Sequence, residues 1–236
     1  MTVILIAVLA AFLQRITGFG FALLSVPLMS LAIAPSLAVV VASLCSWPNT
    51  MITAWQLRRH IDVPLARRYA LWSLVGMPAG LVILDAVPVR PFRVFLGVVV
   101  ALATIVMASG WRPRTVRRAV EVAAGIMAGV LATSTGTNGP PLVLALNARR
   151  LAPDQFRGTI SAIFVASNVS LLLFWWRGLI TRPALTLGGL ALPLIPLAAY
   201  AGLRASRRLR DAHFERLVVV LLFVSAASAI YGGLRG

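Results

Sequence analysis

Apolar, almost uncharged segments recur along the chain, and their length constrains the fold more than any other feature. They include residues 36–56, 69–86 and 92–109. A helix of about 20 residues crosses a hydrocarbon core of roughly 30 Å. With 60% hydrophobic residues and a mean hydropathy of +0.92, the 236-residue chain is too apolar for a soluble domain of this size. The sequence therefore predicts an all-α integral membrane protein that crosses the bilayer several times.

A polar interruption divides another apolar stretch, residues 129–146. The interruption, residues 134–139, holds three hydroxyls, one amide and two glycines, and two prolines follow it. A weaker copy with the sequence QRITGFGF lies at residues 14–21. Polar, irregular backbone is tolerated at membrane depth only where protein buries it or where it lines a watery cavity. Because broken helices of this kind mark the substrate site in many transporters, we expect the two breaks to form a binding site.

The same order of segments occurs twice, which predicts two repeats, residues 1–110 and residues 119–236. Each repeat has two short apolar segments around a break, followed by three longer spans. Identical residues fall at matching places, and one such match is Asn49 with Asn168. The expected hairpins are residues 1–33 and 120–148, and the expected spans are residues 36–56, 69–86 and 92–109 in the first repeat and residues 159–176, 184–203 and 214–233 in the second.

Residues 1–13 are apolar, as in a signal peptide, but they lack the basic residues with which a signal peptide begins. In the duplication they match residues 121–132, which lie inside the chain. We therefore expect residues 1–13 to belong to the first hairpin.

The arginines decide how the two repeats are oriented. If each short pair is a hairpin that enters and leaves on one side, each repeat crosses an odd number of times and the repeats are inverted. One side of the membrane then receives 16 of the 22 basic residues, and the other side receives five. Parallel repeats would move the cluster at residues 204–210 to the other side and remove this bias. Because basic loops stay in the cytoplasm, the sequence predicts inverted repeats with both chain ends outside.

Inversion inserts the two hairpins from opposite faces, so that their breaks meet near the midplane. The half-helix after each break exposes unpaired backbone N–H groups and the positive end of its dipole, which attract a small anion. Glycines let the backbone approach a ligand, and hydroxyl and amide side chains add donors. The candidate binding residues are Arg15, Thr17, Gly18, Phe19, Gly20, Asn49, Ser134, Thr135, Gly136, Thr137, Asn138, Gly139 and Asn168.

Each of these groups also has a plainer interpretation. Glycine and threonine in a membrane hairpin allow close helix packing. Asn49 and Asn168 either line the site or bond across helices. Arg15 contacts the anion, caps the break or extends to the membrane surface. The sequence alone leaves these alternatives open.

Other classes of function find little support in the charged residues. The six acidic residues and the two histidines fall in loops or near span ends. No acid pair, nucleophile with its base or metal-ligand cluster falls at membrane depth, so we expect no enzyme activity, no metal and no cofactor. The single Cys45 cannot form an internal disulfide. The net charge of +16 comes from arginines in short loops that face lipid headgroups, so no nucleic-acid partner is expected.

Two glycine-rich stretches carry a resemblance to a known family. They are residues 17–27, TGFGFALLSVP, and residues 136–146, GTNGPPLVLAL. They resemble the two repeats of the TauE/SafE sulfite exporter family, which includes transporters similar to 4-toluene sulfonate uptake permeases, and the similarity covers essentially the whole chain. The first stretch departs from the family pattern, which often has further glycines where this chain has Phe19, Phe21 and Ala22. The resemblance implies transport of sulfite, sulfonates or related sulfur-containing organic anions across a bacterial inner membrane.

We therefore predict a multi-pass secondary transporter of a small anion, sulfite or an organosulfonate, that works by alternating access at a midplane site. Three alternatives remain: an anion channel with the same pore, a membrane-embedded enzyme that acts on a lipid headgroup, and a scaffold with a packed, dry polar centre. The expected partners are the anion and membrane lipid. The substrate, the transport direction, the coupling ion and the formation of a homodimer stay open.

Overall fold

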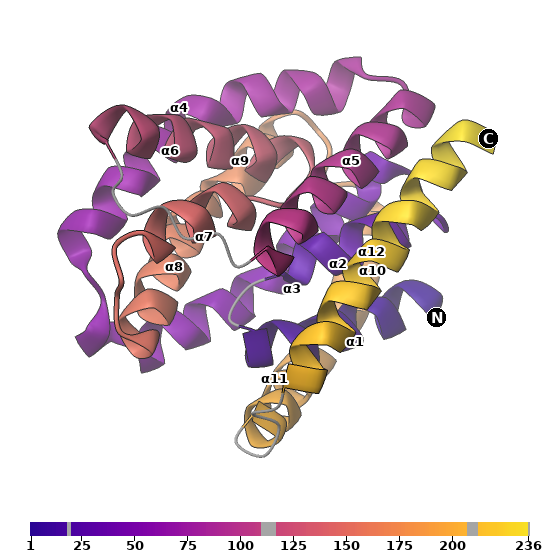
Figure 1. Cartoon of the computed structure of the whole chain (residues 1–236). Helices are drawn as coiled ribbons and strands as arrows, with labels where there is room; N and C mark the ends of the chain where they lie inside the picture. The colour runs from indigo at the N-terminus through magenta and orange to yellow at the C-terminus, as the bar shows by residue number, and fades with distance from the viewer. Residues whose placement is uncertain (18–19, 110–116, 207–211, 236) are drawn as a thin grey trace.

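The computed structural model describes residues 1–17, 20–109, 117–206 and 212–235, and these residues fold almost entirely into α-helices (Figure 1). The first part of the chain forms α1 (Thr2–Thr17), α2 (Phe21–Met29), α3 (Pro35–Gln56), the short 3-10 helix η1 (Arg58–His60), α4 (Val63–Ala86) and α5 (Val89–Ala108). The second part forms α6 (Arg118–Ser134), α7 (Gly139–Asn147), α8 (Pro153–Ser167), α9 (Val169–Trp176), α10 (Arg182–Ala191), α11 (Leu194–Ser206) and α12 (Ala212–Arg235). Among the described residues no strand is present, so the predicted all-α class is confirmed.

Several helices are long and apolar enough to cross a membrane. The described residues contain four such spans, Pro35–Gln56, Val63–Ala86, Val89–Val106 and Pro153–Trp176, the last of which joins α8 to α9. A fifth is the pair α10 and α11, which is bent by 45°. The chain is therefore a multi-pass membrane protein.

Single residues explain the shape of one span and the start of another. The span expected at residues 184–203 is divided at Leu192 and Pro193. The N–H of Leu192 still donates to Gly188 O at 2.8 Å. Proline removes one helical hydrogen bond and its ring clashes with the preceding turn, which explains the bend. Helix α4 begins six residues before the expected residue 69, because the Asp62 side chain accepts a hydrogen bond from Leu65 N at 3.0 Å and caps the helix.

The helices pair across the two halves of the chain. Helix α4 packs along α6, α1 along α11, and α5 along α12 (Figure 1). Glycines make the first of these contacts very close: a Cβ atom on Gly129 would lie 1.8 Å from Ser73 O, and one on Gly80 would lie 2.0 Å from Val130 O. Small residues at such positions let two membrane helices approach until their backbones touch.

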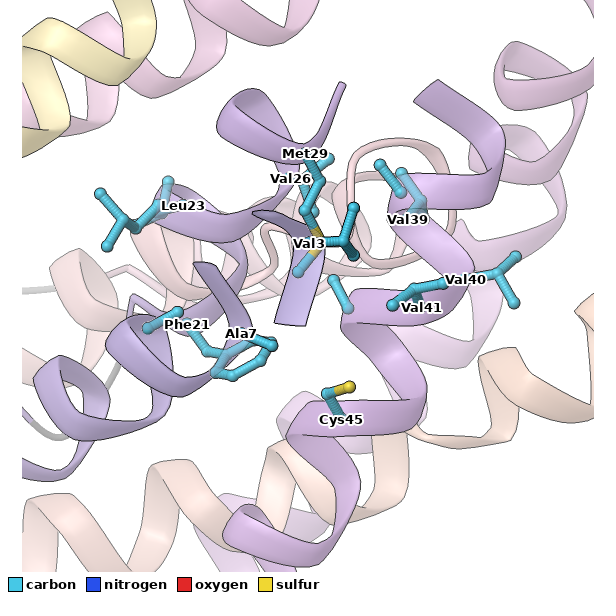
Figure 2. Close-up of a cluster of buried hydrophobic side chains, with 14 of the residues drawn as sticks. Val3, Ala7, Phe21, Leu23, Val26, Met29, Val39, Val40, Val41 and Cys45 are labelled. Atoms are coloured by element: carbon cyan, nitrogen blue, oxygen red, sulfur yellow. The ribbon is translucent and has the colours of Figure 1, made fainter. Parts of the chain in front are cut away.

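The helices that follow the two breaks, α2 and α7, each pack into a separate apolar core. Figure 2 shows side chains of α1, α2 and α3 meeting around Val3, Phe21 and Val41, with the buried Cys45 beside them. A second core gathers Tyr69 of α4, Leu142 and Leu146 of α7, and Ile160 and Ile163 of α8. Burial of these residues fixes α2 and α7, and with them the two breaks that precede these helices.

Candidate functional site

A pocket lies where the two breaks come together. Its walls come from four places: the end of α1 and the start of α2, the end of α6 and the start of α7, the middle of α3, and the junction of α8 and α9. The described lining residues are Gln14, Gly20, Phe21, Ala22, Leu23, Ser43, Ser46, Thr50, Ala132, Gly136, Thr137, Asn138, Gly139, Phe164, Ser167, Asn168 and Ser170. The empty space between these walls is about 540 Å³ when the open mouth is included.

The two breaks approach each other closely at Gly136. A Cβ atom on this glycine would lie 3.6 Å from both Ala22 Cβ and Val26 Cγ2 of α2. Segments that are more than 100 positions apart in the numbering therefore contribute to one wall. The second break thus lies against α2, the helix that follows the first break.

The second break is a tight turn. The N–H groups of Thr135 and Thr137 both donate to Leu131 O, at 3.0 and 3.1 Å, and Gly136 between them has a φ of +70°. Only glycine adopts such a φ without strain. The hydroxyls of Thr135 and Thr137 lie 2.6 Å apart, which further fixes the turn. Helix α7 then begins at Gly139, with two prolines in its first turn.

The first break is built differently. Helix α1 ends at Thr17, and α2 begins at Phe21 behind Gly20, which has a φ of +100°. Among the described residues, no atom lies within 4 Å of the position that a Cβ atom on Gly20 would take, so the positive φ is what favours glycine there. Gly18 and Phe19 lie outside the described residues, as do the side chains of Arg15 and Thr17.

The two asparagines expected in the site have different places. Asn168 lines the pocket at the α8–α9 junction, and its Nδ2 donates to Thr50 Oγ1 at 3.4 Å. Asn49 stands behind the wall: it is 2% exposed and is absent from the described lining. Its Nδ2 donates to Oε1 of Gln14 at 2.6 Å, and Gln14 does line the pocket.

The expected residues of the second break also divide into two groups. Gly136, Thr137, Asn138 and Gly139 line the pocket. Ser134 is fully buried instead, and its hydroxyl donates to the helix carbonyl of Val130 at 2.7 Å. Thr135 is likewise fully buried, and it contacts the pocket only through its bond with Thr137.

Several lining residues were missed in the sequence. Ser43, Ser46 and Thr50 share one face of α3, because they are three and four residues apart. Ser167 and Ser170 flank Asn168 with the same three-residue spacing. Small polar residues at helical spacing inside an apolar span are the signal that would have found them.

The described walls of the pocket carry no charged side chain. Their polar groups are carboxamides, hydroxyls and backbone N–H groups at helix starts. Charged side chains form ion pairs elsewhere: Glu121 pairs with Arg149 and with Arg68, and Asp85 pairs with Arg177. Among the described residues, no group of three or more histidine, cysteine or acidic residues could hold a metal ion.

Comparison with known proteins decides the family. The family model described as Sulfite exporter TauE/SafE matches residues 3–229. The chain belongs to this family. The resemblance in the two glycine-rich stretches is thus confirmed over nearly the whole length, and the family is one of membrane transporters. No curated protein and no solved structure matches the chain.

Proposed function

We propose that this TauE/SafE protein is a secondary transporter of a small anion, sulfite or an organosulfonate, and that the pocket between the two breaks is its binding site. The observation that carries the proposal is the pocket itself, to which both glycine-rich breaks contribute. Two breaks that meet at one site are typical of transporters built from repeats.

The groups around the pocket suit an anion that must be released again. Residues 21–23, the first turn of α2, line the pocket, and the N–H groups of a first helical turn have no partner within their own helix. The positive end of the α2 dipole points the same way. Carboxamides of Asn138 and Asn168 add neutral donors. Neutral donors bind an anion without the tight ion pair that an arginine would form.

The packing of the helices supports two repeats related by an approximate two-fold axis, and the arginine distribution favours inversion. Helix α6, which leads into the second break, packs on α4 of the first half; α1, which leads into the first break, packs on α11 of the second half. Helix α3 packs on α8, and α5 packs on α12. Each contact either has its counterpart or joins two matching helices, as an approximate two-fold axis requires. Alternating access then follows from rocking one set of helices against the other.

The orientation rests on the arginines. In the proposed arrangement the loops at residues 58–68, 111–118, 149–157 and 204–210 face the cytoplasm, and both chain ends lie in the periplasm of a bacterium. The chain carries out no catalysis in this proposal.

Counterflow of sulfite tests the function. The protein in vesicles preloaded with unlabelled sulfite should accumulate radiolabelled sulfite transiently and saturably. A channel would give no transient accumulation, and a scaffold would give no flux. Asn138→Leu, at the pocket, should raise the half-saturating sulfite concentration by about ten-fold, the cost of one hydrogen bond to an anion.

A matched control keeps this experiment specific to the site. Asn147→Leu changes the same residue type at the far end of α7, outside the described lining. It should leave the half-saturating concentration unchanged. If both variants behave like the wild type, the second break does not bind the anion.

A further inference from the structure

One buried side-chain pair joins the pocket to the helix behind it. Gln14 lies in the last turns of α1, is 7% exposed and lines the pocket. Its Oε1 accepts a hydrogen bond of 2.6 Å from Asn49 Nδ2 on α3. The partner itself is buried away from the described wall of the pocket.

The Asn49 side chain is only half satisfied in this arrangement. Its Oδ1 is buried and has no hydrogen-bond partner in the described structure. A buried amide oxygen without a partner destabilises a protein, because it loses its hydrogen bonds to water and gains none within the protein. The hydrogen bond to Gln14 therefore satisfies only one end of the Asn49 amide.

The three hydroxyls of the α3 wall donate their protons to carbonyls of their own helix. On α3, Ser43 Oγ donates to Val39 O at 2.8 Å and Thr50 Oγ1 donates to Trp47 O at 2.8 Å. Ser46 Oγ likewise donates to Ser43 O at 3.2 Å. A hydroxyl has one proton, so these three groups keep only lone pairs for the pocket. An anion there needs donors from other residues.

We propose that Gln14 is a ligand of the anion and that Asn49 is its positioning residue. Because Oε1 is engaged by Asn49, the Nε2 amino group is the end of the amide that remains for the pocket, and it carries two N–H donors. Asn49 thereby selects which end of the amide the anion meets. This inference rests on the proposed function and names the donor that the first break contributes from α1.

Three carboxamides then surround the anion from three elements: Gln14 from α1, Asn138 before α7 and Asn168 at the α8–α9 junction. Each donates without carrying charge. Such a set matches a group with several acceptor oxygens on one centre, as in sulfite or a sulfonate.

A double-mutant cycle separates positioning from plain packing. Gln14→Met keeps the length of the side chain and removes both donors, so the half-saturating sulfite concentration in counterflow should rise about ten-fold. Asn49→Leu keeps Gln14 but removes the hydrogen bond that orients its amide, so this concentration should rise about three- to ten-fold. The double variant should be no worse than Gln14→Met, because Asn49 acts only through Gln14. Effects that add in the double variant, or a Gln14→Met variant that resembles the wild type, would overturn the proposal.

Folding is controlled in the same experiment. The double variant replaces both partners of the bond with apolar groups, which is close to neutral for stability, so a loss of transport with an unchanged unfolding temperature supports the proposal. Gln14→Glu gives a second check, since it turns a carboxylate toward the anion and should abolish counterflow. Transport by Gln14→Glu at the wild-type rate would contradict the assignment.

The matched control is Ser25→Ala. Ser25 lies on α2 and is fully buried. Its hydroxyl has no hydrogen-bond partner among the described residues, and it is absent from the described lining. This variant should transport sulfite as the wild type does. If the wild-type protein itself shows no sulfite counterflow, the proposed function fails and this inference fails with it. Wild-type counterflow with an inert Gln14 overturns the inference alone.

Discussion

The two breaks occupy matching places in the chain but offer a ligand different chemistry. Helix α2 begins Phe21-Ala22-Leu23; all three residues line the pocket, and each of them has a backbone N–H. Helix α7 begins Gly139-Pro140-Pro141, and two of these three residues have no N–H. In the proposed anion site the second break therefore offers side chains, above all Asn138, where the first offers backbone N–H groups. Duplicated halves of a site need not share its binding groups equally.

The helices that carry the breaks are also held differently. Helix α6 rests on α4 through glycines, whereas α1 presents the fully buried alanines Ala7, Ala10 and Ala11 to its neighbours. The α4–α6 contact thus has no room for even one methyl group at Gly129. The second break should tolerate changes in its supporting helix less well than the first.

The largest effect is expected from Gly129→Ala. The new Cβ would lie 1.8 Å from the backbone oxygen of Ser73, so α4 and α6 must separate. The free energy of unfolding should fall by about 3 kcal/mol, the upper end for overpacking. Thermal unfolding in detergent measures it.

Gly189→Ala is the matched control for Gly129→Ala. It lies on α10, and nothing stands within 4 Å of the position its Cβ would take. It should be neutral or raise stability by up to about 1 kcal/mol, because alanine favours a helix more than glycine does. Equal behaviour of the two variants would mean that α4 and α6 are not in backbone contact.

A second difference concerns the start of the helix that leads into each break, α1 for the first and α6 for the second. Glu121, in the first turn of α6, is buried and pairs with Arg149, just after α7, and with Arg68 at 3.6 Å. Val3 precedes Thr17 by as many residues as Glu121 precedes Thr135, and it lies in the apolar core instead. The start of α6 is therefore held by ion pairs, and the start of α1 is held by apolar packing.

Glu121→Gln should therefore lower the free energy of unfolding by about 1–2 kcal/mol, less than a fully buried pair because both arginines are partly exposed. Asp85→Asn breaks the more exposed pair with Arg177 and should cost at most about 1 kcal/mol. Chemical unfolding of the two variants beside the wild type gives both values. A larger cost for Asp85→Asn would reverse our ranking of the two pairs.

The sequence predicted the fold as far as apolar length determines it. Spans such as α3 and α5 follow from uninterrupted apolar runs. Proline does not decide by itself where a helix is divided. The chain is bent at Pro193, between α10 and α11, whereas Pro48 and Pro78 lie inside α3 and α4, which stay continuous. Whether a proline bends or divides a helix depends on the neighbours that support it, and these are absent from a linear pattern.

The site was predicted where glycine, asparagine and proline interrupt a span, as at residues 136–139. Its other wall was missed because serine and threonine inside a helix satisfy themselves on the helix carbonyls, as Ser43 does, and so leave no mark of function. Gln14 was missed as a donor because only the bond from Asn49 orients its amide. That contact joins residues 35 positions apart and needs the fold to be seen.

A smaller effect is expected from Ala22→Pro, which gives α2 the proline that α7 has at its second position. Proline is compatible with a first helical turn, so α2 should still form, but one N–H in the pocket is lost. The half-saturating sulfite concentration should rise about ten-fold if that N–H binds the anion. Ala22→Ser is the control, since it keeps the N–H and should stay near the wild type. Unchanged transport by Ala22→Pro would show that the start of α2 is not a donor.

The smallest effect belongs to the reverse change, Pro140→Ala, which gives the second break a backbone N–H that it lacks. If the two breaks differ only in donors, sulfite should bind about two- to three-fold more tightly, a fraction of one hydrogen bond, because the new N–H must share the anion with Asn138. The same substitution loosens the first turn of α7, since proline restricts the unfolded chain and alanine does not, so stability should fall slightly while affinity rises. Opposite signs in the binding and unfolding measurements are the specific expectation. If affinity falls together with stability, the prolines are needed to shape the second break, and its lack of N–H groups is a consequence of that shape.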